Sequence, residues 1–292
     1  MWFRVQSSIE LLAPPRFGLW RERQAIVDEP ARRSIRTALI TGASSGIGCE
    51  LAKILANQHY NLVLVGRDWP RLLSLAAELE SRHGITVTPI AKDLSLPNSP
   101  AEVLAELRQR AIFIDVLINN AGFALSGEFA STNIEQTVAL LHVNVVSLTH
   151  LTRLLVPGMI SRRWGRVLNV ASIAGFYPGP LTACYNASKA FVVSFSQALS
   201  NELQGTGVSV TCLCPGPTRT RFAQRAGLSH SKAFSENVMD AAAVAQAGYA
   251  AMIAGKPVAV SGLRNKLRML PIPLVPNRVL AHFSRKYHEV GV

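Results

Sequence analysis

The sequence predicts an α/β protein in which a doubly wound, seven-stranded parallel sheet carries helices on both faces. Short apolar runs alternate with longer helical stretches along most of the chain, which is typical of parallel strands joined by helical crossovers. Such crossovers are right-handed, so successive helices cover both faces. The expected strands are residues 35–40, 61–66, 85–91, 115–118, 166–171, 208–213 and 257–260, with helices that include 49–57, 70–83, 100–111, 134–156 and 239–254.

One domain is expected to account for most of the chain. At 292 residues the sequence exceeds the usual domain size, but α/β folds of this length often form one unit around one sheet. We therefore expect a single domain over residues 35–261. An extension with several Arg and Pro residues (1–34) would precede it, and a basic amphipathic tail (262–292) would follow it.

Composition restricts the classes of function. Hydrophobic residues make up 49% of the chain and charged residues 16%, which is typical of a globular protein. The formal net charge of +12 suits nucleic acid, an anionic membrane surface or a phosphorylated ligand. Nucleic acid is not expected, because zinc-finger spacing and RNP-like aromatic segments are missing. The cysteines lack metal-ligand spacing, so we expect reduced thiols and no metal site; they are Cys49, Cys184, Cys212 and Cys214.

Apolar segments bear on the location of the protein. Residues 1–34 contain no apolar run typical of a signal peptide, and no stretch of about 18 apolar residues occurs in the chain. We therefore expect a cytoplasmic protein. The tail interleaves six Lys and Arg residues with apolar ones. It could contact an anionic membrane, cover a subunit interface, or form an ordinary solvated helix.

A glycine-rich turn follows the first expected strand. Thr-Gly-Ala-Ser-Ser-Gly-Ile-Gly (41–48) separates that strand from a helix. Glycines here allow a tight turn and a close approach of the backbone to a pyrophosphate, while the helix N-terminus offers free amides. This Rossmann-type arrangement predicts a dinucleotide site, and a loop without a ligand is the alternative. The candidates are Thr41, Gly42, Ser44, Ser45, Gly46, Ile47 and Gly48.

The end of the second expected strand bears on the choice of coenzyme. An acidic side chain at this point binds the ribose 2′-hydroxyl of NAD, whereas an arginine can pair with the 2′-phosphate of NADP. Gly66 leaves room and Arg67 supplies positive charge, so we predict NADP(H), with NAD(H) as the alternative. Arg67 could instead be a solvated turn residue, with Asp68 only capping the next helix.

Tyr185 and Lys189 lie four residues apart at the start of an expected helix, so they share one helical face. A phenol titrates near pH 10, and a neighbouring ammonium favours its ionised form. Ser172 ends a strand, and the Gly- and Pro-containing loop after it can return it to this helix. Asn144 lies among apolar residues of helix 134–156, where a buried Asn usually only satisfies a backbone group.

In their order and spacing these motifs resemble those of the classical short-chain dehydrogenases/reductases over residues 35–261. The resemblance implies that Tyr185 is the acid or base that interconverts a carbonyl and an alcohol, while Ser172 hydrogen-bonds the substrate oxygen. Lys189 would bind the nicotinamide ribose and lower the pKa of Tyr185, and Asn144 would hold the water of a proton relay. Hydride transfer to a carbonyl generates an alkoxide, which requires such a positioned donor. Further implied coenzyme contacts are Asp93, Leu94, Asn119, Ala121, Gly122, Pro215, Gly216, Thr218 and Thr220.

The resemblance also locates a substrate pocket. Its residues would be Phe123, Ala124, Phe176, Tyr177, Pro178 and Leu181, although Phe176 could instead belong to the core. Their apolar character favours a hydrophobic carbonyl compound or its alcohol. Residues 221–236 are polar without a clear period, which suits a mobile lid over the site.

We therefore predict an NADP-dependent oxidoreductase that interconverts a hydrophobic ketone or aldehyde and its alcohol. The enzymatic alternative is a 3-oxoacyl thioester reductase, whose basic surface could dock an acidic acyl carrier. The non-enzymatic alternative is a nucleotide-sensing or membrane-scaffolding protein that kept the fold. The resemblance further implies a homodimer or homotetramer, for which the apolar face of helix 134–156 is a candidate interface.

Overall fold

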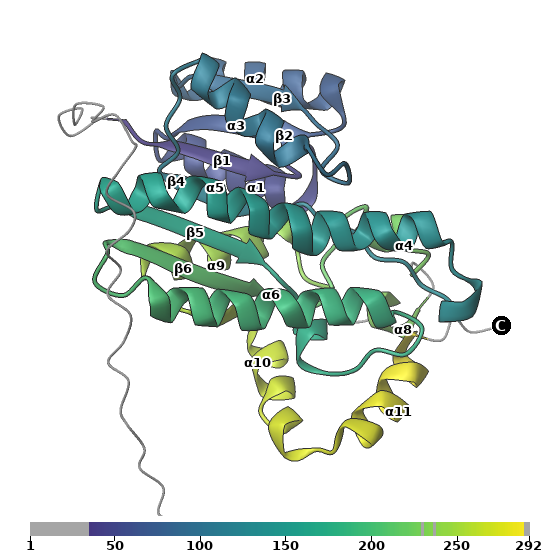
Figure 1. Cartoon of the computed structure of the whole chain (residues 1–292). Helices are drawn as coiled ribbons and strands as arrows, with labels where there is room; N and C mark the ends of the chain where they lie inside the picture. The colour runs from purple at the N-terminus through teal and green to yellow at the C-terminus, as the bar shows by residue number, and fades with distance from the viewer. Residues whose placement is uncertain (1–34, 229–230, 236–237, 289–292) are drawn as a thin grey trace, which may run out of the picture. The chain divides into compact units, whose positions relative to one another are not determined.

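The computed structural model describes residues 35–288 except 229, 230, 236 and 237 (Figure 1). The extension expected at residues 1–34 therefore lies outside the described residues. Within the described part, seven strands form one parallel sheet in the order β3-β2-β1-β4-β5-β6-β7, which confirms the predicted fold class. The strands are β1 (Thr37–Thr41), β2 (Asn61–Gly66), β3 (Val87–Ala91), β4 (Val116–Asn119), β5 (Gly165–Val170), β6 (Val208–Cys214) and β7 (Val258–Val260).

β1 and β4 are neighbours at the point where the strand order reverses. Ala38 pairs with Val116 and Ile40 with Ile118. The chain proceeds outward from β1 to β3 and then returns to β4 on the other side of β1. In open parallel sheets, ligands bind at the carboxyl ends of the two strands that flank this switch point. The glycine turn after β1 and residues 120–122 after β4 both lie at that edge.

Helices cover the two faces of the sheet (Figure 1). One layer comprises α1 (Gly46–Asn57), α2 (Trp69–His83) and α9 (Ala241–Ile253), and the other comprises α3 (Ser99–Gln109), α5 (Leu148–Ser161) and α6 (Ala183–Glu202). Successive strand residues point to opposite faces. Ile40 and Leu64 accordingly pack in the core beside the first layer, and Leu39 and Val63 pack beside the second. All four are fully buried, which explains the apolar strand runs in the sequence.

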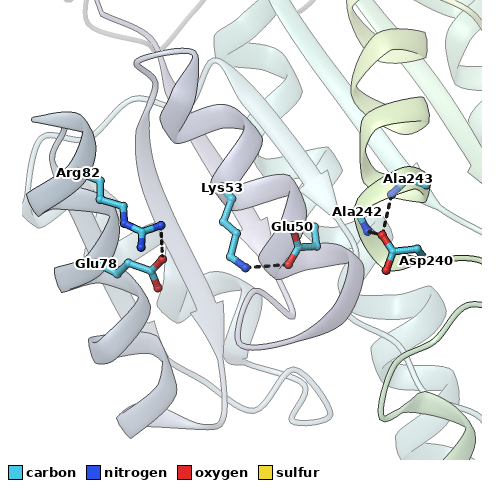
Figure 2. A network of polar contacts seen from close by, with 7 residues as sticks. All are labelled: Glu50, Lys53, Glu78, Arg82, Asp240, Ala242 and Ala243. Carbon is cyan, nitrogen blue, oxygen red and sulfur yellow. Dashed lines mark hydrogen bonds and ion pairs between the residues drawn. The ribbon is translucent and has the colours of Figure 1, made fainter.

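Polar side chains set the ends of two helices. The Asp68 carboxylate accepts a hydrogen bond at the start of α2, and Gly84 ends that helix with a φ of +62°. Asp240 caps α9 by accepting hydrogen bonds from the amides of Ala242 (3.0 Å) and Ala243 (3.4 Å), as Figure 2 shows. Such caps typically contribute about 1 kcal/mol each. The surface ion pairs in Figure 2, Glu50–Lys53 (2.8 Å) and Glu78–Arg82 (3.0 Å), contribute less, at roughly 0.3–0.5 kcal/mol.

The helix expected at residues 134–156 is longer and contains a wide turn. It begins as α4 (Ile134–Leu141), continues through a π-helical segment (His142–Ser147) and ends with α5 at Ser161, beyond Pro157. By length and composition these 28 residues could cross a membrane, which the search for about 18 consecutive apolar residues did not indicate; buried core helices pass the same test. Residues of α5 such as Leu151 and Met159 pack into the core, so we assign this helix to the fold.

Two regions after β6 frame the site. Residues 221–236, for which no period was evident, contain α7 (Phe222–Arg225) and α8 (Lys232–Ser235). The tail forms α10 (Leu263–Met269), a 3₁₀ turn (Ile272–Leu274) and α11 (Asn277–His288). These last helices are yellow in Figure 1, and α11 contacts α8.

Candidate active site

The turn between β1 and α1 depends on glycine. Gly42 has a φ of +66°, and a Cβ there would lie 2.9 Å from Asn120 Nδ2. Glycine accommodates both the left-handed backbone and the close approach. At the start of α1, the Ser45 side chain makes no capping hydrogen bond. The first backbone amides of α1 therefore have no hydrogen bond from a Ser45 cap, and they are available to bind an anion.

Asn120, which was not among the predicted site residues, holds this turn. Its Nδ2 donates to the carbonyls of Thr41 (2.9 Å) and Gly42 (3.2 Å). Thr41 Oγ1 accepts hydrogen bonds from the amides of Asn120 and Ala121, both at 3.0 Å. A Cβ on Gly48 would collide with the Asn120 side chain. Thr41 and Gly48 thus support the turn from behind.

Asn119 differs from its expected place at the coenzyme. It is buried at the end of β4, where its Nδ2 donates to Thr152 Oγ1 (3.0 Å) and Asn169 Oδ1 (2.9 Å). Asn169 in turn donates to Ser196 Oγ at 2.9 Å. Adjacent residues of an extended segment point to opposite sides, so Asn119 connects β4 to α5 and β5 while Asn120 faces the glycine turn.

Arg67 and Asp93 face each other at the ends of β2 and β3. Arg67 Nη1 lies 3.7 Å from Asp93 Oδ2. Burial raises the pKa of Asp93, but hydrogen bonds from Ser95 and the Arg67 charge outweigh this, so the pKa lies below its usual value. Asp68 caps α2, which is the role that it has in the alternative interpretation of this strand end. The Arg67 side chain remains 64% exposed at the rim of a cavity, where a ligand can reach it.

Tyr185, Ser172 and Lys189 meet beyond the end of β5. The Ser172 hydroxyl hydrogen-bonds with the Tyr185 phenol, and Lys189 Nζ lies 5.8 Å from the centre of the Tyr185 ring. Burial raises the pKa of Tyr185 to about 12, and the Ser172 hydrogen bond offsets part of this rise. Burial lowers the pKa of Lys189 to about 8, and its ammonium donates to the Val170 carbonyl at 2.8 Å.

This electrostatic picture differs from the expected lowering of the Tyr185 pKa by Lys189. Desolvation disfavours the charged form of each group. In the chain without coenzyme, this effect is larger for Tyr185 than any stabilisation of the phenolate by the ammonium. At neutral pH the pair therefore consists of a protonated phenol and a largely protonated amine.

Asn144 lies in the π-helical segment and is 1% exposed. Its Nδ2 donates to the Phe123 carbonyl and to Ser188 Oγ, both at 3.0 Å, and its Oδ1 accepts from the Phe123 amide at 3.1 Å. The side chain thus ties the turn after β4 to α6 and lies behind the cavity wall. Its role in a proton relay stays a prediction.

The segment after β6 crosses the glycine turn. Thr218 Oγ1 donates to the Gly216 carbonyl at 2.9 Å, which shapes the first turn. A Cβ on Gly46 would lie 2.9 Å from Thr220 Cγ2, so this segment rests directly on the start of α1. Pro215, Gly216, Thr218 and Thr220 all line the cavity, in agreement with their expected position.

A cavity of about 1030 Å³ joins these groups, at the upper end of the usual range for small-molecule sites. Among the predicted residues it is lined by Gly42, Ser44, Ser45, Gly46, Ile47, Arg67, Asp93, Leu94, Ala121, Gly122, Phe123, Ser172, Tyr177, Tyr185, Lys189, Pro215, Gly216, Thr218 and Thr220. Phe176 packs instead with the core cluster of α6 and β6, and Ala124 packs with Ala226 and Leu228. Pro178 and Leu181 are also absent from the wall of this cavity as the described residues form it.

Two further groups of residues line the cavity: the first belongs to the segment 221–236 that was predicted to cover the site, although its individual residues were not named, and the second was not predicted. Arg221, Phe222, Arg225, Leu228 and Phe234 come from the segment after β6, and Arg268, Met269, Ile272, Leu280, Phe283 and Tyr287 come from the tail. The tail pattern of apolar residues was visible in the sequence. The contact of the tail with the site was not visible, because these helices follow the last strand and the strand order does not determine where they pack.

One end of the cavity fits a dinucleotide. The glycine turn leaves backbone exposed beside the start of α1, and Arg67 and Asp93 lie where an adenosine would extend. The other end carries Tyr185, Ser172 and Lys189 beside apolar side chains. Residues at this end would hold a nicotinamide, which would supply hydride, and Tyr185 would be the group that supplies the proton.

Comparisons with known proteins agree with this geometry. The model of the family described as "short chain dehydrogenase" matches residues 36–230. A very-long-chain 3-oxoacyl-CoA reductase from Phaeosphaeria nodorum is 42% identical over 181 residues, which is 60% of this chain and 53% of that protein. The chain thus spans about half the length of this curated relative.

Two solved structures share the fold closely. A short-chain dehydrogenase from Sphingobium yanoikuyae in complex with NADPH is 36% identical, with a TM-score of 0.74 over 80% of this chain and 91% of the other. A bulky-bulky ketone specific alcohol dehydrogenase from Comamonas testosteroni is 32% identical, with a TM-score of 0.70 over 83% and 94% of the two chains. The chain therefore belongs to the short-chain dehydrogenase/reductase family.

Proposed function

We propose that the protein is an NADPH-dependent reductase of 3-oxoacyl thioesters with long apolar acyl chains. The observation that supports this most directly is the cavity that extends from the glycine turn, past Tyr185, to apolar side chains of the tail. The relative from Phaeosphaeria nodorum carries the name of this activity. This substrate class replaces the simple ketone or aldehyde as the preferred candidate.

The chemical roles follow from the groups around Tyr185. The coenzyme would supply hydride to the 3-carbonyl carbon. Tyr185 would donate its proton to the 3-oxygen, since a phenol with a pKa of about 12 is fully protonated at neutral pH. Ser172 would donate a hydrogen bond to the same oxygen, and Lys189 would bind the nicotinamide ribose. Asn144 would act from behind the wall by fixing the backbone at Phe123.

The acyl chain would occupy the end of the cavity formed by the segment after β6 and the tail. Its apolar lining comprises Leu125, Phe222, Leu228, Phe234, Met269, Ile272, Leu280 and Phe283. Each buried methylene contributes about 0.8 kcal/mol. An acyl chain that fills this region therefore gains far more binding free energy than a short one.

NADP(H) is the preferred coenzyme in this proposal. Arg67 borders the cavity and is mostly exposed, so it can pair with a 2′-phosphate, and the Sphingobium yanoikuyae neighbour was solved with NADPH. The ratio of kcat/KM for NADPH to that for NADH should fall about tenfold in Arg67→Ala, because a charge-assisted contact is lost. An unchanged ratio would remove Arg67 from the coenzyme site.

The substrate proposal is tested by steady-state reduction of 3-oxoacyl-CoA esters with short, medium and long chains. We expect kcat/KM to rise with chain length, by roughly fourfold for each methylene that becomes buried. Leu280→Asn should reduce this gain while short esters react normally. A kcat/KM that does not change with chain length would contradict the acyl-chain assignment.

A bulky ketone is the second candidate substrate. The Comamonas testosteroni neighbour is named for such ketones, and the same apolar region could accept a fused or branched ring system. Parallel assays with an aromatic bulky ketone and a long 3-oxoacyl-CoA separate the candidates. Higher kcat/KM for the ketone would favour the second.

Peripheral membrane contact is a further part of the proposal, for an otherwise cytoplasmic enzyme. Leu263, Leu267, Leu270 and Leu274 are 57–86% exposed, and the tail also carries Lys266 and Arg278 among its cations. Exposed leucines beside positive charge suit an anionic bilayer, from which a long acyl substrate would enter. Co-sedimentation with vesicles should require anionic lipid and fall in a Leu263→Ser, Leu267→Ser, Leu270→Ser variant. The exposed residues Leu73 and Leu96 lie outside the tail, so their replacement by Ser is the control.

Self-association is proposed through α4 and α5. Ile134, Val138 and Leu141 are 61%, 46% and 38% exposed and lie on one face of α4. An apolar helical face of this kind suits a second copy of the chain. Light scattering should give a dimer or tetramer for the wild type and a smaller species for Val138→Glu. A monomeric wild type would exclude this interface.

A further inference from the structure

Two arginines of the segment after β6 lie on the wall of the coenzyme end of the cavity. Arg221 immediately precedes α7 and Arg225 ends it, and both line the same cavity as Arg67. Side chains four residues apart on a helix lie on one face, with about 5–6 Å between their Cβ atoms. The segment is held in this position because Thr220 packs on Gly46 in the glycine turn.

The carboxylates near these arginines already have partners. Asp93 pairs with Arg67 at 3.7 Å, and Asp68 pairs with Arg71 at 3.3 Å while it caps α2. In the part of the chain that the structure describes, neither Arg221 nor Arg225 has a carboxylate within 4 Å. This side of the site therefore carries four arginines but only two carboxylates, and Arg67 and Arg71 already pair with both of these carboxylates.

Two observations indicate that this cluster can bind an anion. Arg221 Nη2 is buried and has no hydrogen-bond partner among the described residues, a costly state for a charged donor. The pKa of Arg225 is lowered, first by burial and then by the positive charges of Arg221, Arg67 and Arg71. An arginine that only faces solvent would experience neither effect. A phosphate bound between these groups would relieve both.

We propose that Arg221 and Arg225 bind the phosphates of NADP(H): Arg221 binds the diphosphate beside the glycine turn, and Arg225 joins Arg67 at the 2′-phosphate. This assignment rests on the proposed NADP(H) preference and adds residues from a different segment to it.

The same helix links coenzyme to substrate. The Phe222 ring centre lies 5.4 Å from that of Tyr185, and Phe222 also contacts Phe234. Binding of phosphate by Arg221 and Arg225 therefore fixes the aromatic wall beside the proton donor. We expect the KM for the acyl substrate to rise in Arg225→Gln with NADPH, and to remain unchanged with NADH.

The test is calorimetric binding of NADPH, NADH, 2′,5′-ADP and ADP to the full chain. Arg225→Gln should reduce the affinity for NADPH and 2′,5′-ADP about tenfold, since a charge-assisted contact is lost. Its affinity for NADH and ADP should not change. Arg221→Gln should weaken NADPH and NADH equally. Arg82→Gln is the matched control, because it removes the same charge from a residue paired with Glu78 outside the cavity lining (Figure 2).

The outcomes are distinguishable. If the wild type binds NADPH no better than NADH, the NADP(H) preference itself fails. If Arg67→Ala loses the preference but Arg225→Gln retains it, only the inference on α7 is overturned. 3′,5′-ADP is a probe for coenzyme A. If Arg225→Gln reduces the affinity for 3′,5′-ADP but not for 2′,5′-ADP, Arg225 binds a phosphate of the substrate rather than of NADP(H), and the inference is also overturned.

Discussion

Removal of the Tyr185 hydroxyl tests the proposed proton transfer most directly. Tyr185→Phe deletes one oxygen and preserves the ring that packs against Phe222 at 5.4 Å. The loss for the fold is the hydrogen bond with Ser172, which contributes about 1 kcal/mol to the free energy of unfolding. The variant should therefore fold and bind coenzyme.

The expected kinetic effect follows from the pKa of Tyr185. A pKa of about 12 lies 5 units above pH 7, so only about one phenol in 10⁵ is ionised there. At neutral pH the phenol is therefore protonated, as its proposed role as the acid in reduction requires. A positioned donor contributes about 10²–10⁴-fold to the rate, so kcat for reduction should fall by this factor, or roughly 3–5 kcal/mol in activation free energy.

NADPH consumption under substrate saturation measures this effect. Tyr249→Phe serves as the control, because Tyr249 lies on α9 and does not line the cavity. Tyr177→Phe removes a hydroxyl from the cavity wall and should change KM more than kcat. In the reverse direction, the rate of alcohol oxidation should rise with pH as the phenolate forms. Full turnover by Tyr185→Phe would refute the assignment of Tyr185 as the acid.

Three further changes separate structural from functional roles. The folded-state pKa of Lys189, about 8, lies below its ordinary value of 10.5. Between these two pH values the unfolded chain binds more protons than the folded one. The free energy of unfolding of the coenzyme-free protein should therefore rise with pH across this window, by up to about 3 kcal/mol. Denaturant titrations of Lys189→Met should lack this rise, and parallel curves for the two proteins would contradict the shifted pKa. Asn119→Ala should cost about 1–3 kcal/mol, because the buried Asn169 Oδ1 and Thr152 Oγ1 lose the hydrogen bond that Asn119 Nδ2 donates to them. Asn98→Ala is its control, since the Asn98 side chain makes no capping hydrogen bond, and equal losses would argue against the Asn119 network. Gly42→Ala and Gly84→Ala both strain a positive φ, but no atom of the described residues lies within 4 Å of a Cβ at Gly84. Calorimetry should therefore show loss of NADPH binding for Gly42→Ala alone.

Local patterns determined much of the fold. Strand and helix positions followed from alternating apolar runs, and the glycine turn was evident because a strand, small residues and a helix are contiguous in the sequence. Helix ends shifted by a few residues, as at α5, which continues past Pro157 to Ser161. The pair Tyr185 and Lys189 was also legible, since spacing on one helix is a local property.

Where two adjacent residues face opposite sides, only the tertiary structure showed which of them belongs to the candidate site. Asn119 and Asn120, like Phe176 and Tyr177, are neighbours with equally suitable side chains. The sheet and its helices decided that Asn119 and Phe176 enter the interior while Asn120 and Tyr177 reach the cavity. Side-chain alternation predicts that two neighbours differ in direction, but which direction leads to the cavity depends on the packed layers.

What the sequence by itself determined is therefore the sheet, the glycine turn and the spacing of Tyr185 and Lys189 on one helix, because each depends on residues close together in the chain or on the order of strands. Only the tertiary structure decided that burial shifts the pKa values of Tyr185 and Lys189, that Arg225 approaches Arg67 and Arg221, and that the tail encloses the apolar end of the cavity. These properties depend on desolvation and on contacts between distant segments, which arise only when the chain is folded.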